Sequence, residues 1–348
     1  LCMVPAPTYD PRLLIGRQRG KNYTMLVNDP QKPLFDRALQ GAYPPGSTFK
    51  PTQGLILLQE GIVDLHTQYP CYRGFICGNL RVGCHGHGSP IALKPALQTS
   101  CNAYFCWGLK AMLDNNRRKY GSSANAFEVW KKHLVSLGYG YKLGIDLPHE
   151  SRGFIPNEKF YNKIYGQDHW SALTIISVAI GQGEILATPL QIANLSATIA
   201  NRGWFITPHV VKQIQDTVID EKYRRKRIPD IRTEYFEDVA EGMRMAVTGG
   251  TCRLANLPDI EVCGKTGTAQ NPHGKDHSAF IGFAPYNDPK IAVCVYVENA
   301  GFGATYGVPI GSLIIEKYLK GSISPQRKGM EERMLNSNTI IYSGVKKH

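Results

Sequence analysis

Serine and lysine residues occur in this sequence at a spacing that could support nucleophilic chemistry. Ser47 and Lys50 are three residues apart and follow the rigid turn Tyr43-Pro44-Pro45-Gly46. At the start of a helix this spacing places both side chains on one face, where the positive helix terminus favours a developing alkoxide. A serine hydroxyl needs a base to take its proton, and a lysine can be that base if burial or a neighbouring cation keeps it neutral. Alone, the pair is a weak pattern, because Ser47 could equally be a helix N-cap and Lys50 a solvated residue.

Two further groups of residues add the remaining parts of such a site. Ser100-Cys101-Asn102 offers a hydroxyl and an amide that could relay a proton and bind a peptide carbonyl. In Lys265-Thr266-Gly267-Thr268, on a predicted strand, the two threonines lie on one face and could hold a carboxylate. Gly267 would let another backbone approach closely, and the N–H groups of Thr268 and Ser47 could form an oxyanion hole.

The elements that must position these residues follow from hydrophobic periodicity. A helix is expected from the Ser47 turn to Glu60, with Gly61 at its end, and another over 93–113, interrupted near Thr99-Ser100. Residues 1–36 read as extended and turn-rich, and residues 66–90 as a Cys/His/Gly-rich loop. Further helices are predicted at 173–180, 189–200, 232–247 and 309–319, and strands at 260–269, 278–284 and 291–297. Helices first and an antiparallel meander last predict an α+β fold.

Composition excludes several classes of protein. Of 348 residues, 43% are hydrophobic, which excludes a disordered chain. The net charge of +12 is spread along the chain, and its densest block, residues 222–227, is typical of a solvated loop. No apolar run approaches the roughly 20 residues of a membrane helix. The chain lacks an initiator Met, so we expect a truncated product.

The three groups match, in order, the Ser-x-x-Lys, Ser-x-Asn and Lys-Thr-Gly motifs of the penicillin-recognising serine enzymes. With Arg37-Ala38, Gly181-Gln182-Gly183-Glu184 and Val297-Glu298-Asn299, the chain resembles the class B penicillin-binding proteins, and among them the subclass of the rod-elongation machinery. The resemblance implies a penicillin-binding/β-lactamase-like transpeptidase fold, α+β, with an antiparallel sheet flanked by helices and a mainly helical subdomain. We expect this domain over residues 1–321, truncated at its N-terminus, and a C-terminal tail over 322–348. Because the family's domain normally begins with a further strand, Leu1–Pro5 would be the strand after it.

The resemblance also implies a function. Ser47 would be acylated by the D-Ala-D-Ala end of a peptidoglycan stem peptide, and an amine of a second stem peptide would take the acyl group. Roles follow for the other motif residues: Lys50 as base, Ser100 as proton shuttle, Asn102 in positioning, Lys265 in setting the local field, and Thr266, Gly267 and Thr268 in binding the substrate carboxylate or a β-lactam. The chemistry would need no cofactor. The expected partners are stem peptides, β-lactam antibiotics, and the membrane polymerase and scaffold proteins of the rod complex; no nucleic acid is expected. The catalytic domain would lie in the periplasm and would be attached to the inner membrane by an anchor.

Cysteine and histidine residues crowd the segment after the first motif and predict a metal site. We hypothesise a structural zinc held by Cys71, Cys84, His87 and Cys101, because zinc favours four such ligands. Some relatives are similar in carrying a metal near this position, with a carboxylate-richer ligand set. A Cys71–Cys84 disulfide and free buried thiols remain alternatives. The histidines without partner spacing, including His133, His209 and His273, are expected at the surface.

Three other functions remain open at this point. A D,D-carboxypeptidase would use the same motifs with water as acceptor, and a serine β-lactamase or β-lactam sensor would share the scaffold. Glu128, Glu150 and Glu184 each lack the Asn four residues later that class A hydrolases carry, so a slowly released acyl-enzyme is expected. A non-enzymatic basic polymer-binding module would instead show steep salt dependence and no labelling by penicillin.

Overall fold

The computed structural model describes residues 1–115, 117–167 and 169–339. Its α-helices in these residues are α1 (Arg19–Asn28), α2 (Lys50–Gln59), α3 (Leu93–Thr99), α4 (Asn102–Lys110), α5 (Arg117–Tyr120), α6 (Ser123–Ser136), α7 (Glu158–Tyr165), α8 (Pro189–Ala200), α9 (Thr233–Gly249), α10 (Gly307–Lys320) and α11 (Lys328–Leu335). Its strands are β1 (Gly74–Cys77), β2 (Leu80–Gly83), β3 (Phe205–Ile206), β4 (Lys226–Arg227), β5 (Cys263–Ala269), β6 (His277–Ala284) and β7 (Ile291–Val297). No helix in these ranges combines the length and apolar character needed to cross a membrane.

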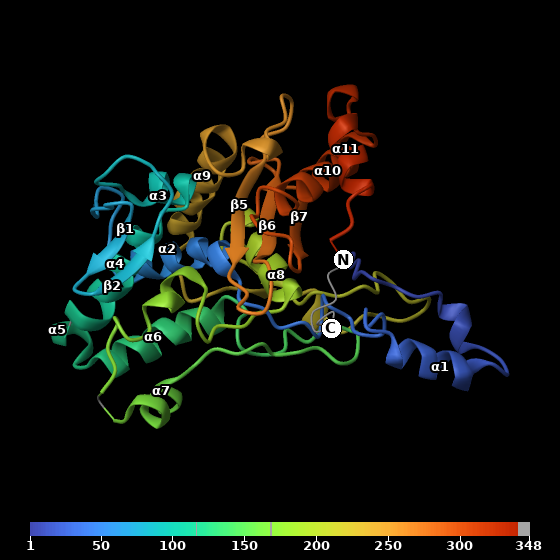
Figure 1. Ribbon diagram of the computed structural model, residues 1–348, viewed down its shortest axis with the longest axis horizontal. Coiled ribbons are helices and arrows are strands. Elements are labelled where there is room, and N and C mark those ends of the chain that lie inside the picture. Colours follow the sequence, from blue (N-terminus) through green and yellow to red (C-terminus); the bar gives the residue numbers. More distant parts are fainter. Residues whose placement is uncertain (116, 168, 340–348) are drawn as a thin grey trace, which may run out of the picture.

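The predicted antiparallel meander is confirmed as the sheet β5-β6-β7, in that order. Its two faces follow the period-two alternation of β6: Ile281 and Phe283 join the main core with α8, whereas Phe280 packs with α10. Figure 1 shows the sheet at the centre of the molecule, with α10 beside β7 and the helical region around α4 and α6 beyond β5. The expected α+β architecture, an antiparallel sheet flanked by helices plus a mainly helical subdomain, is therefore present.

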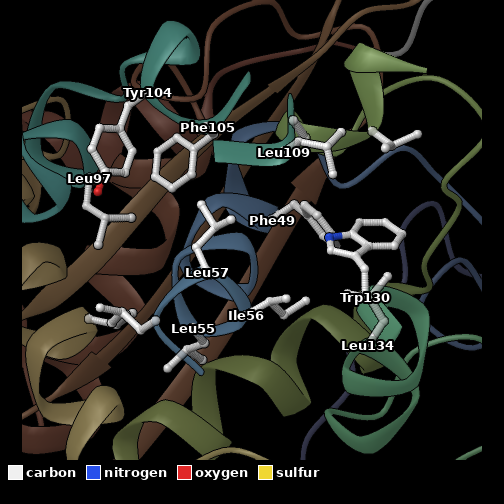
Figure 2. Close-up of a cluster of buried hydrophobic side chains, with 14 of the residues drawn as sticks. Phe49, Leu55, Ile56, Leu57, Leu97, Tyr104, Phe105, Leu109, Trp130 and Leu134 are labelled. Atoms are coloured by element: carbon white, nitrogen blue, oxygen red, sulfur yellow. The ribbon is translucent and has the colours of Figure 1, made fainter. Parts of the chain in front are cut away.

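Helix α2 lies between the sheet and the helical subdomain, and it is buried from Lys50 to Leu58. Leu55, Ile56 and Leu57 point to different sides and all contact core residues, as expected for a helix that is apolar all round. Figure 2 shows these side chains between Leu97 and Phe105 on one side and Trp130 and Leu134 on the other. Pro51 is tolerated in its first turn because the N–H there has no intrahelical partner. The core therefore fixes the helix that follows Ser47.

The structure corrects three predictions outside the core. Leu1–Pro5 is not a strand: it pairs with no part of the sheet, Leu1 and Val4 are exposed, and Pro5 lacks the N–H that a ladder needs. Residues 1–36 contain helix α1. Residues 66–90 contain the hairpin β1–β2, in which Gly78 adopts a positive φ between the strands.

The C-terminal residues form a short helical appendage on the domain. Arg327 forms an ion pair with the buried Glu316, with 3.0 Å between Nε and Oε2, and so holds α11 against α10. The boundary expected between residues 321 and 322 stays a prediction, and residues 340–348 of the expected tail lie outside the described residues.

Candidate active site

Ser47 lies in a tight turn that the core holds rigid. The 3-10 helix η2 (Gly46–Phe49) leads directly into α2, so Ser47 stands at the positive end of a buried helix. Thr48 Oγ1 donates to the Pro45 carbonyl at 2.6 Å, and the buried Phe49 ring packs edge-on against Tyr139. Ser47 itself is half-buried. The turn therefore fixes its backbone and leaves its side chain accessible.

Lys50 is fully buried and joins the first motif to the second. Its Nζ donates to the Ser100 carbonyl at 2.7 Å, to Ser100 Oγ at 3.0 Å and to Asn102 Oδ1 at 2.6 Å. An ammonium group has three protons, and these three acceptors take them all. None of the three is Ser47, although Lys50 follows it by one turn.

Ser100 is the point at which all three motifs meet. It has φ +58° between α3 and α4, and this break in the helix is the one predicted near Thr99-Ser100. Its Oγ accepts from Lys50 and, at 2.8 Å, from Lys265 on β5. With both lone pairs occupied, the hydroxyl keeps its own proton as a donor. Residues 50, 100 and 265 thus form one continuous hydrogen-bonded row.

The two lysines carry buried charge without an acidic partner. In the part of the chain that the structure describes, no carboxylate lies within ion-pair distance of either Nζ. Burial lowers the pKa of Lys50 to about 8, against a smaller opposing effect of the thiols at Cys101 and Cys84. Burial, followed by repulsion from Lys50, lowers the pKa of Lys265 to about 7. Neutral lysine is therefore accessible near physiological pH, which an exposed lysine would not allow.

The third motif lies on β5, the edge strand nearest to the Ser47 turn. A Cβ on Gly267 would lie 3.2 Å from the Pro45 carbonyl and 2.8 Å from Thr48 Cγ2, so the expected close approach of a second backbone is present. Thr268 Oγ1 accepts from the N–H of Gly303 at 3.3 Å, and Thr266 Oγ1 donates to the hydroxyl of Thr251 at 2.9 Å. Both hydroxyls therefore have partners from neighbouring loops.

Asn102 connects the motif residues to the Cys/His-rich segment. Its Oδ1 accepts from Lys50, while its Nδ2 donates to the Gly83 carbonyl at 2.7 Å. Both ends of the amide are engaged, so Asn102 holds the end of β2 next to the start of α4.

The four residues hypothesised as metal ligands come together beside this asparagine. The ligand atoms of Cys71, Cys84, His87 and Cys101 all lie within 4.8 Å of one another, and the Cys84 and Cys101 sulfurs are 4.0 Å apart. Cysteines 77, 106, 252, 263, 294 and 2 are not part of the cluster. Each of the nine cysteines, all within the described ranges, is a free thiol.

Two of the four side chains in this cluster have properties that suit a metal ligand. A hydrogen bond from Cys101, helped by the N–H of Ala103 and opposed by burial, lowers the pKa of Cys84 to about 5. The His87 Nδ1 lies 2.8 Å from the Gly88 carbonyl, which fixes Nδ1 as the protonated nitrogen, and its buried Nε2 has no hydrogen-bond partner. A thiol with a lowered pKa and an imidazole nitrogen without a hydrogen-bond partner therefore belong to the same cluster.

Sequence reasoning missed two residues around the site and misplaced one. Thr251 and Gly303 were not singled out, because they contact the third motif only through tertiary packing. The Gly249-Gly250-Thr251 turn after a long helix was the available signal for Thr251. His133 is wrong as a surface residue: it is buried on α6 and its Nε2 lies 2.6 Å from Glu60.

Comparisons with known proteins agree with this geometry. The family model described as the penicillin binding protein transpeptidase domain matches residues 1–316. The peptidoglycan D,D-transpeptidase MrdA of Acinetobacter baumannii is 32% identical over 334 residues, which cover 88% of this chain and 47% of that protein. The peptidoglycan D,D-transpeptidase PbpA of Mycolicibacterium smegmatis is 29% identical, over 92% of this chain and 64% of its own length. The chain spans about half the length of the MrdA relatives it matches.

Solved structures show the same fold. Pseudomonas aeruginosa PBP2 in complex with WCK 5153 superposes with a TM-score of 0.76 at 29% identity, over 93% of this chain and 72% of that one. The Helicobacter pylori PBP2 in its complex with MreC gives 0.74 at 26% identity, over 91% and 57%. The family model matches most of the chain, the fold is shared with solved relatives, and three motifs meet at Ser100. The chain therefore belongs to the penicillin-binding protein transpeptidase family.

Proposed function

We propose that this chain carries the active site of a serine-type peptidoglycan D,D-transpeptidase, the activity that its MrdA relatives are named for, and that this enzyme serves cell elongation. The observation that carries the proposal is the hydrogen-bonded row Lys50–Ser100–Lys265 behind Ser47. Such a row can move a proton between a nucleophile and a leaving amine, which acyl transfer through a serine ester requires.

Acylation begins when Ser47 Oγ attacks the carbonyl carbon of the penultimate D-Ala. Neutral Lys50 takes the hydroxyl proton, and the oxyanion is stabilised by the N–H groups of Ser47 and Thr268. The C–N bond then breaks, and the Ser100 hydroxyl gives its proton to the departing D-Ala amine and is reprotonated from Lys50. The amine of a second stem peptide then attacks the ester carbonyl and gives a proton to neutral Lys50. The C–O bond to Ser47 breaks as the new amide forms, and Lys50 returns the proton to Ser47 Oγ.

The third motif holds the substrate during these steps. Lys265 supplies positive charge beside Ser100, while Thr266 and Thr268 hold the terminal carboxylate next to Gly267. Asn102 keeps Lys50 in place. A β-lactam presents a similar carboxylate and a reactive amide, so it would acylate Ser47 and be released slowly.

Labelling with a fluorescent penicillin tests the nucleophile. We expect stoichiometric, covalent labelling of the purified chain and its loss in Ser47→Ala, because Ser47 is the proposed nucleophile that forms the ester. Ser337→Ala is the matched control, since Ser337 is bonded only to the end of α11 and should label normally. Equal labelling of Ser47→Ala and the wild type would contradict the assignment.

Product analysis distinguishes the acceptor. With a stem peptide ending in D-Ala-D-Ala and a second amine-bearing peptide, a transpeptidase yields free D-Ala and a cross-linked product. Hydrolysed peptide alone would identify a D,D-carboxypeptidase, and rapid turnover of penicillin would identify a β-lactamase. Salt-dependent binding of anionic polymer with no labelling would identify a non-enzymatic module.

The partners and location follow from the same proposal. The solved relatives include a PBP2 in complex with MreC, and a related structure is described as a peptidoglycan synthase complex that coordinates polymerization and crosslinking. We therefore assign this chain a membrane polymerase and a scaffold protein of the rod complex as partners. We also propose that the active site works in the periplasm, where its stem-peptide substrate would lie, with attachment to the inner membrane.

A structural zinc at Cys71, Cys84, His87 and Cys101 is a second part of the proposal. Tetrahedral zinc with metal–sulfur distances of about 2.3 Å separates two sulfurs by roughly 3.8 Å, close to the 4.0 Å between Cys84 and Cys101. Two further observations fit metal ligands. His87 Nε2 is buried and has no hydrogen-bond partner, and Cys84 Sγ accepts hydrogen bonds from the N–H groups of Asn102 and Ala103. The metal would supply no chemistry to acyl transfer; it would cross-link the loop before β-strand β1 to the start of α4.

Metal analysis tests this site independently of activity. We expect about one equivalent of zinc in the purified chain, a large loss in Cys84→Ser, and retention in Cys294→Ser, whose thiol lies on β7 outside the cluster. Less than about one-tenth of an equivalent of zinc, together with a Cys71–Cys84 disulfide in the mass spectrum, would overturn the proposal.

A further inference from the structure

The segment Gly181-Gln182-Gly183-Glu184 contacts the site but has no role in the mechanism above. It follows the 3-10 helix η4 (Ile176–Ile180), which packs against α4 and against the η2 turn. The backbone N–H of Gly46 donates to the Gly181 carbonyl at 2.8 Å, and Tyr43 pairs with Ala187 in an antiparallel bridge. The segment therefore runs alongside the residues that lead into Ser47.

Gly181 is required by this close approach. Its φ is +70°, and a Cβ there would lie 2.4 Å from the Gly46 carbonyl oxygen and 2.5 Å from Phe49 Cβ. The next residue, Gln182, is held by its N–H to the Ser177 carbonyl at 3.1 Å. The side chain of Gln182 then crosses to β5, where its Nε2 donates to the Thr268 carbonyl at 3.2 Å.

This contact bears on the oxyanion hole. In an antiparallel strand the N–H and C=O of one residue point to the same edge. The Thr268 carbonyl points away from β6, since a Cβ on Gly46 would meet it at 2.8 Å and Gln182 reaches it from outside the sheet. The Thr268 N–H consequently points to the same edge, toward the Ser47 turn.

We propose that Gln182 is a positioning residue for the transpeptidase reaction, whose side-chain amide sets the orientation of Thr268 and thereby of one oxyanion-hole N–H. The inference rests on the proposed function above. One short segment then holds both donors: Gly181 fixes the residue before Ser47 by a backbone hydrogen bond, and Gln182 fixes Thr268 by a side-chain one. A small displacement of an oxyanion donor lowers the rate of acylation more than it weakens substrate binding.

Two variants separate this hydrogen bond from packing. Gln182→Met keeps the length and volume of the side chain without a donor, and Gln182→Glu places a carboxylate oxygen against the Thr268 carbonyl. Tyr161→Phe is the matched control, because it removes the hydrogen bond from Tyr161 to Glu184 in the same segment and leaves the Gln182 contact intact. A chromogenic β-lactam gives two quantities, the dissociation constant of the initial complex and the first-order rate constant of acylation. An alkyl boronate, which forms a tetrahedral adduct with serine, gives a third, its affinity. The midpoint of thermal unfolding is measured for each variant.

We expect the acylation constant to fall roughly 10-fold in Gln182→Met and roughly 100-fold in Gln182→Glu, with boronate affinity falling in parallel. The initial complex of Gln182→Met should keep its dissociation constant within about twofold, and its thermal midpoint should match that of Tyr161→Phe. Wild-type acylation and boronate affinity in Gln182→Met would overturn the inference, as would losses that Tyr161→Phe reproduces. Failure of the wild type itself to be labelled at Ser47 would instead contradict the proposed function.

Discussion

The charged side chains at the two ends of helix α2 have opposite surroundings. At its C-terminal end, Glu60 accepts hydrogen bonds from Lys119 at 2.6 Å and from Tyr120 at 2.6 Å, and lies 2.6 Å from His133 Nε2. At its N-terminal end, the ammonium groups of Lys50 and Lys265 meet at one neutral hydroxyl. One end surrounds a carboxylate with donors, and the other brings two cations together in the interior.

The direction of the pKa shifts expresses this difference. Burial alone would raise the pKa of Glu60, but its three donors outweigh burial and lower the pKa to about 2, so the charged form is stabilised. For Lys50 and Lys265 burial is not compensated, and the charged forms are destabilised. A protein gains nothing in stability from such a pair of lysines, and strained electrostatics of this kind mark sites of catalysis. The comparison therefore agrees with the proposed chemistry at one end of α2 and with anchoring at the other.

The largest effect that would sharpen this comparison is expected from Lys50→Met. Removing the base should slow acylation of Ser47 by at least about 10³-fold. The free energy of unfolding should change by no more than about 1 kcal/mol, because relief of a buried charge offsets the donors lost by Ser100 and Asn102. Single-turnover penicillin labelling and urea unfolding measure the two quantities.

Lys119→Met is the control at the other end of the helix. It removes a donor from Glu60 and should lower the free energy of unfolding while Ser47 labels at the wild-type rate. If Lys50→Met lost stability and kept activity, the assignment of the two ends would be reversed.

The meeting of the three motifs was easier to predict from the sequence than the contacts around them, for a physical reason. Ser47, Ser100 and Lys265 belong to motifs whose residue types are dictated by one reaction, so their order alone indicated that they meet. The break at Ser100 and the three strands of the sheet also followed from local patterns. Nothing local shows that Gln182 contacts Thr268, because the two residues are 86 positions apart and a glutamine between glycines is typical of any loop.

The errors came from patterns too short or too mixed to interpret. The β1–β2 hairpin has four residues in each strand, too few for alternation to stand out among cysteines and glycines. His133 was placed at the surface although Ala126 and Trp130, seven and three residues before it, define the buried face of α6. A histidine on such a face is buried when a carboxylate such as Glu60 is there to bind it.

The pH dependence of acylation tests the N-terminal end more finely. Because Lys50 and Lys265 interact through Ser100, they titrate as a pair, and the form with one proton has both a neutral base and a cation. Lys265, with a pKa of about 7, loses the first proton more readily than Lys50, with a pKa of about 8, and transfer of the remaining proton through Ser100 then leaves Lys50 neutral and Lys265 charged. The acylation rate should rise with pH as the first proton leaves near pH 7 and fall as the second leaves near pH 8, changing about tenfold per pH unit on the outer flanks. In Lys265→Arg the cation does not titrate, so the falling limb should disappear. A falling limb that persists in this variant would show that another group is responsible.

The smallest effect is expected at the C-terminal end, from Glu60→Gln. The substitution keeps the shape and weakens three hydrogen bonds, so the free energy of unfolding should fall by about 1–2 kcal/mol at neutral pH. Since the pKa of Glu60 is depressed from 4.5 to about 2, its stabilisation is complete above pH 4.5 and is lost as the pH falls toward 2. The free energies of unfolding of the wild type and Glu60→Gln, measured in urea, should therefore converge as the pH falls through that window. Glu234→Gln is the control, because Glu234 forms an exposed ion pair with Arg232. Its free energy of unfolding should differ from that of the wild type by less than about 0.5 kcal/mol at every pH. If Glu60→Gln slowed acylation by more than about twofold, the anchoring end of α2 would be coupled to the chemistry, and the contrast between the two ends would not hold.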